Sequence, residues 1–140
     1  MRRLLVGALV LGLCGVASSP ALAIKQLNDH FKKLYAGDDA DEGFKMLVDE
    51  AKCNVCHVDR ENKKKVRNPY GKALHEVLEE AEFPLAEFKK DPEKYAEELT
   101  KLFKKVEGME SGSQKYKTFA DRMKAGLLPG GDVKGKPDGQ

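Results

Sequence analysis

The feature that most constrains this chain is the run Lys52-Cys53-Asn54-Val55-Cys56-His57. Two cysteines three positions apart, at the end of a helical segment, lie on adjacent sides of one turn. Both thiols can therefore react with the same planar ring system, and the histidine that follows is held under the plane of that ring. Since imidazole is the commonest metal ligand of proteins, the pattern predicts a metal-containing group held covalently through two thiols.

The order C-x-x-C-H is the attachment motif of c-type haem. The thiols would add across the two vinyl groups of the porphyrin, and His57 would be the proximal iron ligand. A structural zinc site is a second interpretation, but it needs two more ligands, and the chain has only one further cysteine and two further histidines. A thioredoxin-like dithiol is a third, and it requires a βαβ context that the helical flanks do not offer. We therefore predict one covalent haem c at Cys53 and Cys56.

Through these residues the chain resembles the small monohaem c-type cytochromes of class I, in a divergent form. The resemblance implies an all-α bundle of four to five helices wrapped around the haem. It also implies an electron-transfer carrier, rather than an enzyme, that works between redox protein partners. Lys45 and Asp49 depart from that class, which usually has a glycine and an aromatic residue at these places. Two other functions stay open: a haem-based ligand sensor or enzyme with an open sixth position, and a haem subunit of a larger oxidoreductase complex.

The first 23 residues have the anatomy of a secretory signal peptide. Arg2 and Arg3 precede an apolar stretch, and the segment ends in Ala-Leu-Ala. The stretch of about 14 apolar residues is shorter than the ~20 that span a bilayer, so we expect no stable membrane insertion. A lipid-bearing Cys14 is the alternative, although the bulky Leu13 stands before it. We expect cleavage after Ala23 and a periplasmic or otherwise exported protein, because cytochromes of the kind that the chain resembles receive their haem after export.

The charge balance gives no argument for binding nucleic acid or an anionic membrane. The chain has 25 basic and 23 acidic residues, so loss of Arg2 and Arg3 with the signal peptide leaves 23 of each. Residues 60–67 nevertheless contain five basic side chains. This basic segment is either a solvated loop or a cationic rim that attracts an acidic redox partner. Four acidic residues between positions 76 and 82 could balance it.

Hydrophobic periodicity predicts helices throughout one domain, residues 24–131. We expect helices over residues 24–35, 41–52, 69–81, 91–107 and 115–126. Asn68-Pro69 and Asp91-Pro92 mark the starts of the third and fourth helices, and Gly108 ends the fourth. Residues 132–140 lack periodicity and are predicted to form a disordered tail.

The motif leaves the sixth iron ligand open. Met109 is the leading candidate, because it lies in a glycine-containing loop between the last two expected helices, where the resemblance places an axial methionine. His75 is the rival, on the helix that follows Pro69. Lower-ranked candidates are Met123, which we expect in the core, and Met46 and His30, which precede the motif.

The resemblance also implies a role for Pro69, twelve residues after His57. Its carbonyl would accept a hydrogen bond from the ring nitrogen of His57 that does not bind iron, which would fix the ring and raise its basicity. An ordinary turn proline is the alternative interpretation.

Overall fold

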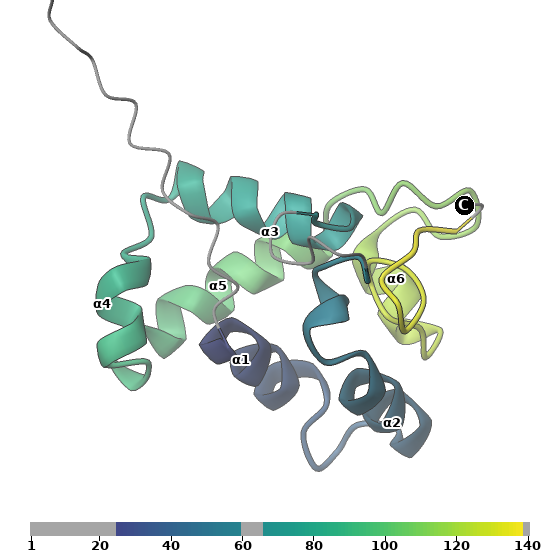
Figure 1. Ribbon diagram of the computed structural model, residues 1–140, viewed down its shortest axis with the longest axis horizontal. Coiled ribbons are helices and arrows are strands. Elements are labelled where there is room, and N and C mark those ends of the chain that lie inside the picture. Colours follow the sequence, from purple (N-terminus) through teal and green to yellow (C-terminus); the bar gives the residue numbers. More distant parts are fainter. Residues whose placement is uncertain (1–24, 60–65, 139–140) are drawn as a thin grey trace, which may run out of the picture.

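The computed structural model describes residues 25–59 and 66–138. Over these residues the prediction of an all-α protein is confirmed, since no strand occurs, but there are six α-helices rather than four to five (Figure 1). The elements are α1 (Lys25–Tyr35), α2 (Glu42–Ala51), the 3-10 helix η1 (Lys52–Val55), α3 (Pro69–Glu80), α4 (Leu85–Lys90), the 3-10 helix η2 (Glu93–Tyr95), α5 (Ala96–Glu107) and α6 (Phe119–Lys124). The signal segment, residues 1–23, and most of the basic segment, residues 60–65, lie outside the described residues.

Short polar side chains begin the helices. The carboxylate of Asp41 accepts a backbone N–H of the first turn of α2 at 3.0 Å. Asn68 caps α3 in the same way, and Pro69 takes the first helical position, where the N–H that proline lacks would have no helical partner. Thr118 and Asp121 form a capping box at the start of α6. These caps explain why α2 and α3 begin within a residue of the predicted positions.

The core joins α1, α3, α5 and α6 through aromatic rings. Tyr70 is central, with its ring centroid 5.7 Å from that of Phe31 in α1 and 5.2 Å from that of Phe119 in α6. Phe103 of α5 lies 6.4 Å from Phe31 and completes the cluster. In Figure 1, α5 runs between α3 and α1. Because Tyr70 is the second residue of α3, this cluster fixes the start of α3, close to the Cys-x-x-Cys-His turn.

Parts of the helical pattern differ from the prediction. α4 was not expected, because six residues are too few for helical periodicity to be recognised; its Phe88 packs on Phe83 with 5.6 Å between ring centroids. The predicted fourth helix begins as η2 and continues as α5. The last helix begins at Phe119 and not at residue 115, since the backbone before it pairs across the loop, with the N–H of Ser111 donating to the carbonyl of Lys117 at 3.0 Å.

The C-terminal segment also differs from the prediction, because residues 132–138 are folded rather than disordered. The N–H of Gly135 donates to the carbonyl of Asp132 at 2.8 Å, and the N–H of Asp132 donates to the carbonyl of Lys136 at 2.9 Å. Gly135 has a φ of 71°, which a glycine adopts without strain. The glycine and charged residues that indicated disorder thus form tight turns, which the rest of the chain holds in place.

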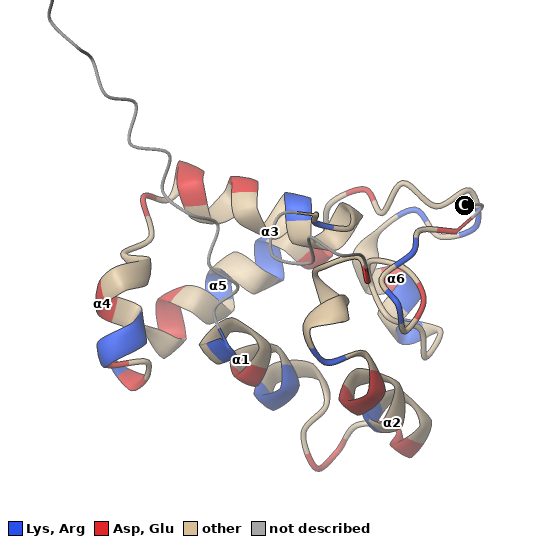
Figure 2. Cartoon of the chain, in the orientation of Figure 1, with Lys and Arg blue, Asp and Glu red and all other residues tan. Residues whose placement is uncertain are grey.

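Charges of both signs are distributed over the surface (Figure 2). Acidic side chains occupy the end of α3 that leads to α4, and two of them have nearby partners. Glu80 pairs with Lys105 at 2.8 Å, and Glu79 lies 3.2 Å from the imidazole of His75. This acidic group is therefore partly balanced by its own neighbours. None of the helices within the described ranges is long and apolar enough to cross a membrane.

Candidate functional site at the Cys-x-x-Cys-His turn

The two cysteines lie on a single 3-10 turn that follows α2. Lys52 has a φ of 51°, which ends the α-helix and turns the backbone into η1. Cys53 is exposed on this turn, Cys56 caps its end and is partly buried, and both are free thiols. The structure therefore presents one thiol toward solvent and one toward the core. Both come from a single turn, where the sequence spacing had placed them.

A backbone carbonyl orients the imidazole of His57. The Nδ1 atom lies 3.3 Å from the carbonyl oxygen of Val66, which also accepts the N–H of Val58 at 3.1 Å. Because a carbonyl only accepts, Nδ1 carries the hydrogen, and the lone pair of the ring is on Nε2. This is the tautomer that a histidine needs in order to bind a metal through Nε2.

The carbonyl that lies at Nδ1 of His57 is that of Val66. The resemblance had implied the carbonyl of Pro69 at this place. The backbone of His57 pairs with that of Arg67 as an isolated antiparallel bridge, which brings Val66 alongside the histidine ring. Pro69 instead occupies the first turn of α3. The acceptor at Nδ1 in the structure is thus a carbonyl of the segment before α3. A role for the carbonyl of Pro69 beside a bound haem stays a prediction.

Asn68 holds the turn in place and was missed by the sequence analysis, which had interpreted it only as part of a helix start. The side chain is 1% exposed. Its amide nitrogen donates to the carbonyls of Asn54 and Val55, both at 3.0 Å, and its oxygen accepts the N–H of Gly71 at 2.9 Å. One side chain thus caps α3 and satisfies two carbonyls of the Cys-x-x-Cys-His turn. A buried asparagine beside a helix start is visible in the sequence only as a capping residue, because its second role depends on the tertiary path.

Two glycines allow this close approach. A Cβ atom at Gly71 would overlap the carbonyl of Cys56, so only glycine lets the first turn of α3 lie against the turn. A Cβ atom at Gly130 would overlap the side chain of Asn68. Asn68 is therefore enclosed between α3, the turn and the C-terminal segment.

The environment of the thiols differs from that of a redox dithiol. Burial raises the pKa of Cys56 to about 12, with a smaller contribution from Cys53, whereas reactive dithiols have a lowered pKa, often at a helix N-terminus. Here the cysteines follow the C-terminus of α2, where the helix dipole disfavours a thiolate. The residues that the structure describes also contain no group of three or more Cys, His, Asp or Glu side chains that could hold a metal ion. The raised pKa of Cys56 and the position of both cysteines after α2 are thus unlike those of a thioredoxin-like site.

Of the predicted sixth ligands, the two methionines of the C-terminal half are partly buried against the core. The backbone of Met109 is fixed on both sides, since its N–H donates to Val106 at 2.9 Å and its carbonyl accepts from Phe119 at 3.2 Å. Met123 lines an open cavity of about 650 Å³, together with Tyr35 and other residues of α2, α5 and α6. Met109 thus lies beside the start of α6, and Met123 lies within α6.

The remaining candidates have other surroundings. His75 lies on the partly exposed flank of α3 beside Glu79. His30 lies 3.1 Å from the hydroxyl of Thr100 and packs edge-on against Phe103, and burial lowers its pKa. Met46 is 71% exposed on α2. Among the described residues, no hydrogen bond or ion pair joins any of the five candidates, the two methionines included, to the Cys-x-x-Cys-His turn.

Tyr70 is a buried polar residue that the sequence analysis did not single out as part of the site. It is 0% exposed, and its hydroxyl has no hydrogen-bond partner among the described residues. Burial raises its pKa, and the thiol of Cys56 adds a smaller contribution in the same direction. A buried tyrosine hydroxyl normally has a partner, so a polar group at this hydroxyl would complete this part of the molecule.

No family model, no curated protein and no solved structure matches this chain.

Proposed function

We propose that this protein is an exported monohaem c-type cytochrome that carries electrons between redox protein partners. The observation that carries the proposal is a single turn in which two free thiols precede a histidine whose Nδ1 faces a carbonyl. Cys53 and Cys56 would hold haem c as thioethers, and Nε2 of His57 would be its proximal ligand. Haem c, when bound, supplies an iron centre that accepts and releases one electron. Export is part of the proposal and rests on the sequence of residues 1–23 alone.

The chain's own residues supply the orientation. The Val66 carbonyl holds the ring of His57 and increases its basicity as a ligand. Asn68 ties the turn to the start of α3, so that the two thiols and the imidazole keep one relative geometry. The unpartnered hydroxyl of buried Tyr70 also fits a site that receives a further polar group.

We propose Met109 as the sixth ligand. Its partly buried side chain and its fixed backbone support this role better than the partly exposed flank position of His75. Met123 is the second candidate, because it lines the cavity between α2 and α6. A neutral thioether favours ferrous iron, so either methionine gives a higher reduction potential than a second histidine would.

Haem staining of denaturing gels tests covalent attachment. The full chain is produced in a host that has a cytochrome c maturation system, beside Cys53→Ala, Cys56→Ala and the double variant. We expect a stained band for the natural chain and none for the double variant, because haem without a thioether leaves on denaturation. Cys14→Ser is the matched control, which removes a cysteine outside the motif and should keep the stain. Equal staining of the natural chain and the double variant would contradict the proposal.

A further inference from the structure

The C-terminal residues 128–138, here named the strap, bind the backbone on both sides of the motif. The side-chain amide of Asn54 donates to the carbonyl of Val133 at 3.1 Å. The N–H of Asp59 donates to the carbonyl of Lys134 at 2.8 Å. The strap therefore spans the Cys-x-x-Cys-His turn from its middle to the start of the basic segment.

Gly135, the next residue of the strap, lies against the backbone carbonyl of His57. A Cβ atom at Gly135 would overlap the carbonyl of His57. The φ of Gly135 is 71°, and Gly112, in the loop after α5, has a nearly identical φ of 72° but open space where its Cβ would be. The two glycines therefore share a backbone conformation and differ in what they contact.

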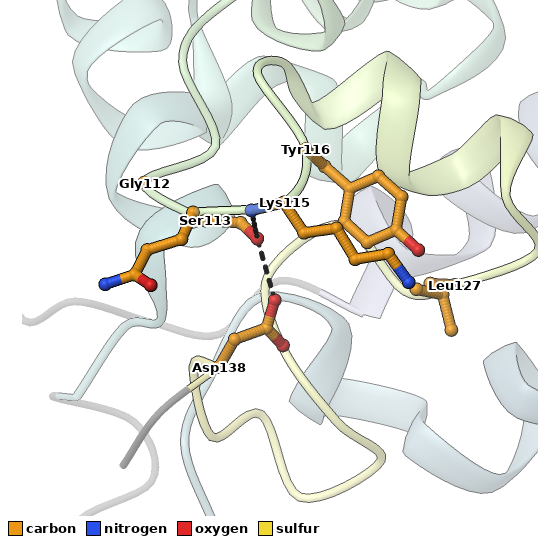
Figure 3. A pocket seen from close by; sticks show the side chains of 7 residues that line it. Gly112, Ser113, Lys115, Tyr116, Leu127 and Asp138 are labelled. Carbon is orange, nitrogen blue, oxygen red and sulfur yellow. Dashed lines mark hydrogen bonds between the residues drawn. The ribbon is translucent and has the colours of Figure 1, made fainter.

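Asp138 anchors the other end of the strap. Its carboxylate accepts a hydrogen bond from the hydroxyl of Ser113 at 2.9 Å (Figure 3) and pairs with the buried guanidinium of Arg122. Arg122 also donates to the carbonyls of Leu128 at 2.9 Å and Gly131 at 3.4 Å. One buried arginine of α6 thus fixes both ends of the strap and, through Asp138, the loop that carries Ser113.

That loop, residues 110–117, directly follows Met109. Its own bonds are local, such as the N–H of Ser113 to the hydroxyl of Ser111 at 3.1 Å. Among the hydrogen bonds of the described residues, the one between Ser113 and Asp138 joins this loop to the strap, which contacts His57 at Gly135.

We propose that the strap positions the loop after Met109 relative to the Cys-x-x-Cys-His turn, with Asp138 as the positioning residue for the loop and Gly135 for the turn. The inference that this positioning acts on an iron ligand rests on the proposed function. The positioning itself does not rest on the proposed function, because all of the contacts that produce it lie within the chain.

Hydrogen exchange of the full chain tests the link at Asp138. Asp138→Ala removes the acceptor of the Ser113 hydroxyl together with the charge that pairs with Arg122, and Glu110→Ala is the control, because it removes an exposed carboxylate of the same loop. We expect amide exchange in residues 110–117 to become about three- to tenfold faster in Asp138→Ala and to stay unchanged in Glu110→Ala. Equal exchange in Asp138→Ala and the natural chain would overturn this link, whether or not haem is bound.

The effect on the iron ligands is tested in the haem-loaded full chain with Gly135→Ala and Gly112→Ala. Both substitutions strain a left-handed backbone, but only the first displaces the carbonyl of His57. We expect Gly135→Ala to shift the reduction potential and to speed carbon monoxide binding, and Gly112→Ala to lower thermal stability alone. Equal spectra and potentials for the two variants would overturn the role of Gly135. If the natural chain takes up no covalent haem, the proposed function fails, and the exchange experiment still decides the link at Asp138.

Discussion

At the scale of single residues, the sequence alone predicts that the two thiols and the imidazole come from one turn, because their spacing along the chain is fixed, and the structure has both cysteines on a single 3-10 turn. The haem that this spacing suits stays a proposal. The groups that orient the thiols and the imidazole could not be identified from the sequence. Val66 contributes only a carbonyl, which any residue has, and Asn68 carries the sequence pattern of an ordinary helix cap. Which carbonyl faces His57 depends on the path of the chain between residues 57 and 67, which leaves no periodic pattern in the sequence.

The double role of Asn68 predicts a large effect for one substitution. Asn68→Ala should lower the free energy of unfolding by about 2–4 kcal/mol, since it removes a helix cap and leaves one buried and one partly buried carbonyl without this donor. Asn68→Asp keeps the cap acceptor but replaces the amide donor with a carboxylate oxygen that faces the same two carbonyls. Urea unfolding of the three proteins separates the two roles. A loss of about 1 kcal/mol in Asn68→Ala, with none in Asn68→Asp, would show that the cap alone matters.

The sixth ligand is also a question at this scale. Met109→Leu should abolish the near-infrared thioether-to-ferric-iron band, lower the reduction potential and open the haem to carbon monoxide. Met123→Leu is the matched control, because it removes a thioether of similar burial from α6. His75→Ala should keep the natural spectrum. Loss of the band in Met123→Leu instead would assign the ligand to α6, and a change in His75→Ala alone would assign it to α3.

At the scale of elements, the helices with caps and long apolar stripes were predicted within a few residues. α4 and the shortened α6 were not, because packing of Phe83 on Phe88 and the paired loop before Phe119 depend on contacts between segments. The position of α3 matters most for the site, because its first turn lies against Cys56. That approach follows from a glycine at position 71.

Gly71→Ala should therefore force α3 away from the turn. Alanine favours a helix by about 1 kcal/mol, but displacement of a packed helix costs about 1–3 kcal/mol, so we expect a net loss of stability and reduced haem incorporation. Gly108→Ala is the control, since a Cβ there has ordinary contacts at the end of α5. Chemical denaturation of both variants measures the effect. Equal stability of Gly71→Ala and Gly108→Ala would contradict the close approach of α3.

At the scale of the whole molecule, the strap was the least predictable part. Its composition is typical of a flexible tail. Its order comes from hydrogen-bond donors elsewhere in the chain, Asn54, Asp59 and the buried Arg122, which bind carbonyls of the strap. The strap also joins two parts of the fold, because it contacts both the Cys-x-x-Cys-His turn and the loop after α5.

The stability that the contacts of Asp138 in the strap provide should depend on pH. The hydrogen bond from Arg122 lowers the pKa of Asp138, burial opposes the shift, and the hydrogen bond from Ser113 and the charge of Lys115 add to it. The unfolded chain, with an aspartate pKa of about 3.9, takes up its proton first as the pH falls. The stabilisation is therefore complete above that pH and is lost below it.

Because Asp138 is half-exposed, we expect Asp138→Asn to lose only about 0.5–1 kcal/mol at pH 7. The difference from the natural chain should shrink as the pH falls below about 4. Urea unfolding of both proteins between pH 7 and pH 3 measures it. A difference that stays constant, or grows on acidification, would contradict the role of this carboxylate.

The central claim is that Cys53 and Cys56 hold one haem together with His57. Its most direct test is tandem mass spectrometry of the proteolytic peptide that contains residues 53–57, prepared from denatured protein made in a host that matures c-type cytochromes. The account predicts one haem per peptide, joined through both cysteine sulfurs. A peptide that carries two free thiols, or a disulfide between them, would contradict it.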